Sequence, residues 1–226
     1  MPETADSSAP AQWVHVSADP SASWHDHRVH WMGNTDPAAV QTSPHEHHTI
    51  IDGWELGLHV DGRQRTVTGQ TRWVPPPPVA PWLVVAVVAA GISFLSSFGV
   101  RLFPAVAIGV CLLGATTVVG VALTMSDPPG GAAIALMLPV CLTLFGLVRA
   151  HFGDHDWAVS SWGLAGIVAV VSIAYGSFFT HSQLPTALAA PVARLVLSLT
   201  VGAGIGAAAG IWATAITARR GAGTTA

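Results

Sequence analysis

Apolar residues are distributed very unevenly along this chain, and the division falls at Pro81. From there onward the sequence consists of long apolar runs separated by short polar segments. A transmembrane helix needs about 20 consecutive, mainly apolar residues. Every charged residue of this part lies at the end of a run, whereas amphipathic helices on a soluble protein would carry charged faces. The pattern therefore predicts a bundle of five transmembrane helices, at about 81–98, 102–125, 132–148, 157–179 and 193–217.

The residues before Pro81 follow a strand-like pattern instead. Trp54–Val60 alternates apolar and polar residues, which is typical of a half-buried strand. Asp61-Gly62 is a hairpin turn signal, and Arg65–Trp73 is expected to be the returning strand. The prolines at 75–78 end this strand and form a stiff spacer.

These patterns divide the chain into five parts. We expect a disordered segment (1–22), a β-sandwich-like domain rich in His and Trp (23–74), a Pro-rich linker (75–80), the helices (81–220) and a short tail (221–226). Two or three strands are too few for an independent sandwich. We therefore expect the β domain to be incomplete, with more strands encoded upstream of Met1.

Composition and charge support a membrane protein. The chain is 51% hydrophobic and 9% charged, against about 25% charged residues in average soluble proteins. Residues 1–80 carry a net charge of −5 and residues 81–226 a net charge of +2. The absence of a basic stripe excludes a nucleic-acid partner. The bilayer is the expected partner, and the expected location is the cell membrane.

Arginines bear on the orientation of the spans. Four arginines flank the spans on each side of the membrane, so their number alone does not decide the orientation. Those in short loops and near the C-terminus, Arg101, Arg149 and Arg219-Arg220, favour a cytoplasmic C-terminus and an extracytoplasmic β domain. Nothing before Pro81 resembles a signal peptide. We therefore expect the natural protein to begin earlier, with a signal.

Histidines provide the candidate chemistry, because eight of the eleven precede residue 61. In a strand, His25 and His27 would point to one face and could share a metal ion, whereas His30 would need a bend to join them. Imidazole suits copper and zinc. The candidate metal ligands from this block and a second one are His25, His27, His30, His45, His47 and His48.

Each histidine block also has a structural interpretation. The first, between Trp24 and Trp31, could be a hydrogen-bonded network that fixes the domain, and the second could be a solvated loop. If the first block binds no metal, its ring nitrogens should bond carbonyls or carboxylates. In both versions we expect the block to be ordered and partly buried between its tryptophans.

The last apolar run contains a stripe of small residues, Gly202, Gly206 and Gly210. Small residues at this spacing let two helix backbones approach closely. The stripe predicts helix packing within the chain, with a membrane-protein partner or with a second copy. No ionisable residue lies at mid-span, and no nucleophile or phosphate-loop motif is present, so we do not expect an enzyme.

Three features carry a resemblance to a known family: the segment Trp24–Met32, the hairpin that ends in Val67–Pro75 and the abrupt passage into spans. Over residues 23–82 the chain resembles a family of uncharacterised actinobacterial membrane proteins. The resemblance implies an exported β domain ahead of helices, and no activity. Trp54, Asp61-Gly62 and Val67-Thr68-Gly69 also weakly resemble the last two strands of the CopC copper-binding sandwich, although the N-terminal histidine expected of CopC is missing here. Two hypotheses follow: membrane-anchored metal binding or handling, and a structural or interaction subunit without a metal.

Overall fold

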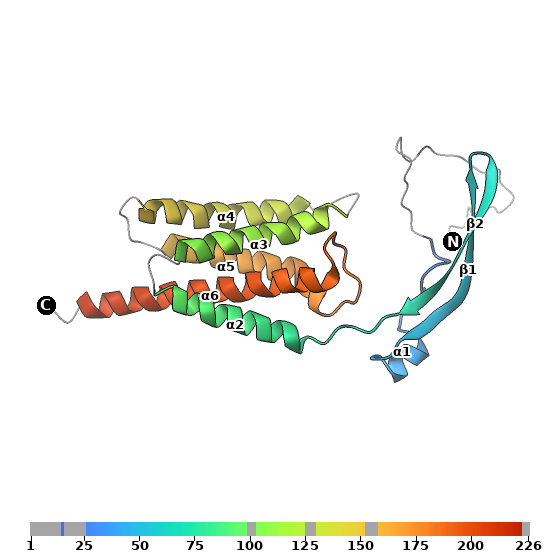
Figure 1. Ribbon diagram of the computed structural model, residues 1–226, viewed down its shortest axis with the longest axis horizontal. Coiled ribbons are helices and arrows are strands. Elements are labelled where there is room, and N and C mark those ends of the chain that lie inside the picture. The colour runs from blue at the N-terminus through green and yellow to red at the C-terminus, as the bar shows by residue number, and fades with distance from the viewer. Residues whose placement is uncertain (1–14, 16–25, 99–102, 125–129, 152–157, 223–226) are drawn as a thin grey trace. The chain divides into compact units, whose positions relative to one another are not determined.

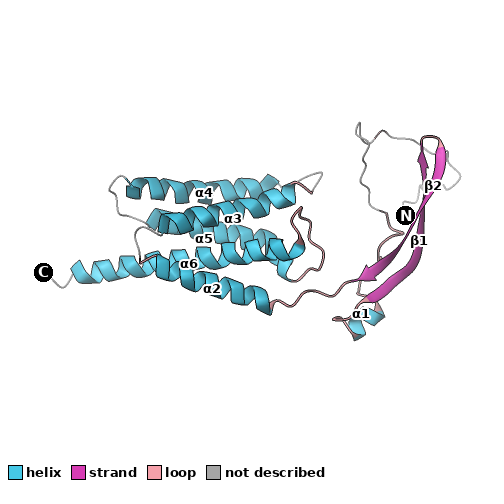
Figure 2. Ribbon diagram, viewed as in Figure 1, coloured by secondary structure: helices cyan, strands magenta, loops and turns pink. Residues whose placement is uncertain are grey.

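The computed structural model describes residues 15, 26–98, 103–124, 130–151 and 158–222. The chain forms two compact units, Met1–Val74 and Pro75–Ala226. The N-terminal unit contains a short helix and a β-hairpin, and the second unit is helical (Figures 1 and 2). The described elements are α1 (Ala38–Thr42), β1 (His48–Val60), β2 (Arg63–Trp73), α2 (Ala80–Ser96), α3 (Phe103–Ala122), α4 (Gly130–His151), α5 (Ala158–Tyr175), the 3-10 helix η1 (Gly176–Phe179) and α6 (Ala190–Ala222).

The hairpin turns at the predicted residues. β1 and β2 are antiparallel, with Val60 opposite Arg63 and His48 opposite Trp73. Asp61 and Gly62 have φ angles of 51° and 72°, so both adopt the left-handed conformation that a two-residue hairpin turn requires. The predicted strands and turn are therefore confirmed. These are the only strands in the part of the chain that the structure describes, so the sandwich itself stays a prediction.

The hairpin is irregular where the sequence places glycines. The pairing shifts between Ile51 and Trp54, and the indole of Trp54 lies across Gly69 on β2, where a Cβ atom would overlap the ring. Glycine in a strand often marks a bulge or a close approach of this kind. Leu56, two residues further along β1, is the buried apolar residue of the strand.

A short segment closes the open end of the hairpin. Trp73 donates a hydrogen bond from Nε1 to the carbonyl oxygen of Pro44 (3.1 Å), and His48 Nε2 bonds the carbonyl oxygen of Ser43 (2.8 Å). Val40, in α1, is fully buried. The sequence pattern does not predict α1, because five residues are too few to show a helical period.

The second unit has a helix at each predicted span. Three helical segments are long and apolar enough to cross a membrane, namely Phe103–Ala122, Val159–Phe179 and Ala190–Thr217. Ala80–Ser96 and Ala135–Arg149 are shorter apolar helical segments. These helices support a membrane protein, whereas five spans go beyond what their lengths show.

Apolar side chains fill the interior of this unit and also cover its surface. Leu164, Ile167 and Leu197 are completely buried where α5 meets α6. On the outside, Ile173 is 87% exposed. Many apolar side chains of α2 are also more than half exposed. Soluble monomers rarely expose large continuous apolar patches. The surface of the helical unit is therefore suited to lipid.

Candidate functional site

The first candidate site is the segment Asp26–Met32, which we call the His loop. Its turn is closed by Asp26: the backbone N–H of Arg28 donates to Asp26 Oδ1 (3.0 Å), and that of Val29 donates to the Asp26 carbonyl oxygen (3.3 Å). The guanidinium of Arg28 donates to both carboxylate oxygens of Asp26, at 2.9 and 2.6 Å. This hydrogen bonding raises the pKa of the Arg28 guanidinium, which stays charged.

The turn brings two of the predicted ligands together. The ring centroids of His27 and His30 are 5.7 Å apart. His30 Nδ1 lies 2.9 Å from the carbonyl oxygen of Asp26, to which it can only donate, so its Nε2 carries the lone pair in the neutral ring. His27 Nδ1 lies 3.1 Å from the thioether sulfur of Met32. Met32 is not among the ligands predicted from the sequence, although it ends the same block.

The hairpin supports the His loop from outside. Thr71, on β2, donates a hydrogen bond of 2.5 Å from its hydroxyl to the carbonyl oxygen of Val29. Because the two residues are 42 positions apart, this bond fixes the loop against the strand. A local pattern in the sequence carries no information about such a contact.

The expected shielding by tryptophan is wrong for Trp31. Its indole is 47% exposed and donates from Nε1 to the carbonyl oxygen of Thr35 (2.7 Å). His30 is half-buried, whereas His27 is exposed. Trp31 therefore does not enclose the loop, and His27 is exposed beside it. Trp24 and His25 lie outside the described residues.

The second histidine block is not joined to the first. His45 and His47 are exposed, and the half-buried His48 bonds Ser43 at the start of β1. Among the described residues, no group of three His, Cys, Asp or Glu side chains is close enough to share a metal ion. The six predicted ligands therefore do not form one described set.

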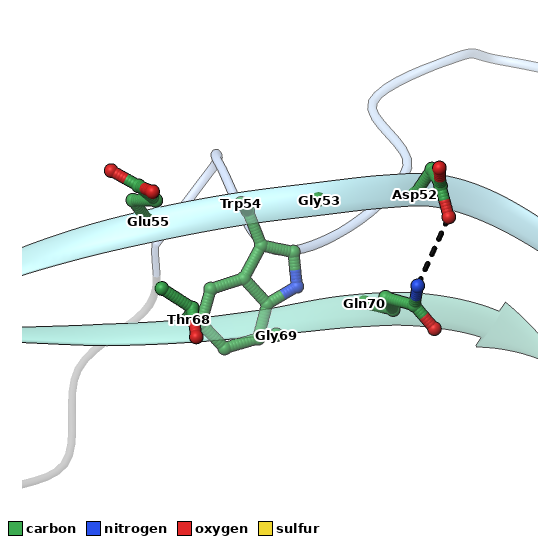
Figure 3. A pocket seen from close by; sticks show the side chains of 7 residues that line it. All are labelled: Asp52, Gly53, Trp54, Glu55, Thr68, Gly69 and Gln70. Carbon is green, nitrogen blue, oxygen red and sulfur yellow. Dashed lines mark hydrogen bonds between the residues drawn. The ribbon is translucent and has the colours of Figure 1, made fainter.

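The hairpin also carries a groove of about 540 Å³ that the sequence did not reveal (Figure 3). Within it, Gln70 Nε2 donates to Asp52 Oδ1 (3.0 Å), and Gln70 Oε1 accepts a hydrogen bond from Arg72, which is not a lining residue (2.7 Å). The indole nitrogen of Trp54 is buried and has no hydrogen-bond partner among the described residues. The groove is lined by Asp52, Gly53, Trp54, Glu55, Thr68, Gly69 and Gln70.

The glycine stripe of α6 faces α2 of the same chain. A Cβ atom at Gly202 would overlap the carbonyl oxygen of Ala86, and one at Gly206 would overlap that of Ala90. A Cβ atom added at Gly210 would lie 2.5 Å from the Cβ atom of Ser97, which directly follows α2. The contacting residue numbers rise together along the two helices, from Gly202 with Ala86 to Gly206 with Ala90, so the helices run parallel. Because α2 covers the stripe, another protein or a second copy would have to bind a different face of α6.

No protein-family model, curated protein or solved structure matches this chain. The resemblances drawn from the sequence therefore stay predictions.

Proposed function

We propose that the protein crosses the membrane five times, with α2 and α4 as the additional spans. Gly202 and Gly206 lie near the middle of the candidate span Ala190–Thr217. They contact Ala86 and Ala90 of α2, so α2 lies at the depth of the α6 centre. The outer face of α2 carries exposed apolar side chains, and at this depth lipid would surround them.

The same reasoning applies to α4, which packs on α5. A Cβ atom at Gly163 would overlap Thr143, and one at Gly166 would overlap Pro139. The residue numbers rise along α5 as they fall along α4, so the two helices run antiparallel. Ser160 also donates from its hydroxyl to the carbonyl oxygen of Thr143 (3.2 Å). Because α5 belongs to a candidate span, its α4 neighbours lie at membrane depth as well.

Polar and aromatic residues mark the proposed boundaries of the hydrocarbon layer. Arg194 donates to the carbonyl oxygens of Phe178 (2.9 Å) and His181 (2.7 Å) at one end of α6. Trp212 packs edge-on against Trp162 near the other end, with 5.9 Å between the ring centroids. Arg194 and Trp212 are 18 residues apart on α6. This separation corresponds to about 27 Å of helix, close to the roughly 30 Å core of a bilayer.

We propose a metal-binding function for the N-terminal unit, which would lie outside the cytoplasm, with the C-terminus inside. The observation that carries this proposal is the pairing of His27 with His30 on a loop that Thr71 and Asp26 hold in place. A bond from Nδ1 to a carbonyl is the usual support for a metal-ligating imidazole. Copper and zinc are the ions that imidazole favours.

A titration of the full-length protein in detergent micelles would test this function. We expect micromolar or tighter binding of Cu²⁺ or Zn²⁺, weakened about tenfold or more by His27→Ala combined with His30→Ala. His59→Ala is the matched control, because His59 is an exposed histidine of β1 outside the loop. Equal binding by the double variant and the control would refute the proposal.

A second candidate function is that of an interaction subunit without a metal. It is favoured by the hairpin, because among the described residues both strands are edges of a two-stranded sheet, and edge strands can pair with another chain. The test is hydrogen exchange at the outward-facing amides of β1 and β2. Protection in native membranes that is lost on purification would support a bound partner, whereas equal exchange would contradict it.

A further inference from the structure

The thioether of Met32 adds a different kind of ligand to the His loop. Its sulfur lies 3.1 Å from His27 Nδ1, and the side chain is 56% exposed. A dissolved ion can therefore reach both atoms from the surface. Because more than half of this side chain is exposed, burial does not account for its position. The contact of its sulfur with the His27 ring therefore needs another explanation.

We infer that the His loop is selective for Cu⁺, bound by His27 and Met32 with His30 as the third ligand. This inference depends on the proposed metal-binding function and specifies its ion. Thioether sulfur is a soft ligand that selects Cu⁺, whereas zinc is well served by imidazole and carboxylate ligands. Met32 is therefore the residue that distinguishes the two metals.

The distance between the two donor atoms is close to what a shared ion needs. Metal–nitrogen and metal–sulfur bonds of about 2.0 and 2.3 Å at a tetrahedral angle place the donors about 3.5 Å apart. The observed separation differs from this by a few tenths of an ångström. Rotation of the flexible methionine side chain covers that difference. His27 would then carry its proton on Nε2 and present Nδ1 to the ion.

His30 is assigned as the third ligand because it lies beside His27 in the same turn. Its ring centroid lies 5.7 Å from that of His27, and Nδ1 is held by the Asp26 carbonyl. The ring therefore presents Nε2 as its lone-pair nitrogen. The alternative explanation is a weak N–H···S hydrogen bond that stabilises the turn, with no ion involved.

The experiment measures Cu⁺ and Zn²⁺ affinities of the full chain, with Cu⁺ supplied under ascorbate and a chromophoric chelator as competitor. Both cysteines, Cys111 and Cys141, are replaced by alanine in every sample, because free thiols also bind Cu⁺. Met32→Leu removes the sulfur at similar volume. The matched control is Met137→Leu, an exposed methionine of α4.

We expect Met32→Leu to weaken Cu⁺ binding about tenfold or more and to leave Zn²⁺ binding within about twofold. X-ray absorption of the full chain with Met32 retained and Cu⁺ bound should show a sulfur neighbour at about 2.3 Å from the copper. This measurement does not depend on the folding of the Met32→Leu variant. Unchanged Cu⁺ affinity, or absence of sulfur scattering, would overturn the inference while Zn²⁺ binding still supports the proposed function. Failure of both ions to bind would reject both.

Discussion

The contact between α2 and α6 makes a quantitative prediction about Gly206. A Cβ atom added there would overlap the carbonyl oxygen of Ala90, well inside the 3.0 Å that real Cβ atoms keep from such neighbours. The obstacle is backbone, so it is not relieved by turning a side chain. The helices must instead separate by on the order of 1 Å, since close-packed interiors leave no spare room.

This separation sets the expected magnitude for Gly206→Ala. Overpacking of this kind typically costs about 1–3 kcal/mol. The separation also stretches the hydrogen bond from the Ser97 hydroxyl to the carbonyl oxygen of Ala207, which is already 3.4 Å long. Alanine regains up to about 1 kcal/mol through its better helix propensity. We expect a net loss of about 1–2 kcal/mol in the free energy of unfolding.

The assay is reversible unfolding in mixed micelles at increasing SDS fraction, followed by far-UV circular dichroism. Gly91→Ala is the matched control, because Gly91 follows Ala90 in the same helix and its Cβ would meet nothing within 4 Å. The control should be neutral, or more stable by up to about 1 kcal/mol. If Gly206→Ala were as stable as Gly91→Ala, the proposed packing of α2 on α6 would be wrong.

Three further predictions concern single contacts. Arg194→Met should lower the stability of the helical unit by about 1–3 kcal/mol in the same assay, because the carbonyl oxygens of Phe178 and His181 lose their donor; unchanged stability would contradict the capping role. Thr71→Val should speed hydrogen exchange in the His loop, and Thr71→Ser should restore protection because it keeps the hydroxyl that bonds Val29. Gly62→Ala should destabilise the hairpin by about 1 kcal/mol, measured by near-UV circular dichroism, because φ is +72° there; an unaffected hairpin would exclude that turn.

The hairpin and the helices could be predicted from the sequence because their signals are local. Alternation in Trp54–Val60 and the turn at Asp61-Gly62 fix strands, faces and register together. The apolar runs likewise locate helices within a few residues, although the ends differ: the last helix extends from Ala190 to Ala222 rather than from 193 to 217. Polar residues at its ends continue the helix beyond the apolar run.

The geometry of the His loop could not be predicted in the same way. A strand would have placed His25 with His27, whereas the turn closed by Asp26 places His27 with His30. The preference of Asp for hydrogen bonds to the backbone two residues ahead is a known local signal. The contribution of Thr71 is different, because it comes from the returning strand and requires the folded hairpin.

The glycines of α6 explain how one helix can organise the helical unit. Gly202 and Gly206 admit α2 on one face, while Gly204, between them, faces α5 and is crowded by Val168 of that helix. Residues two positions apart lie on opposite sides of a helix, so the run presents small residues to two neighbours at the same depth. The helix α2 thus packs on α6 through close contact between the two backbones. Residues 74–79 join β2 directly to α2, so the helix that follows the hairpin in the chain is the one that packs on these glycines.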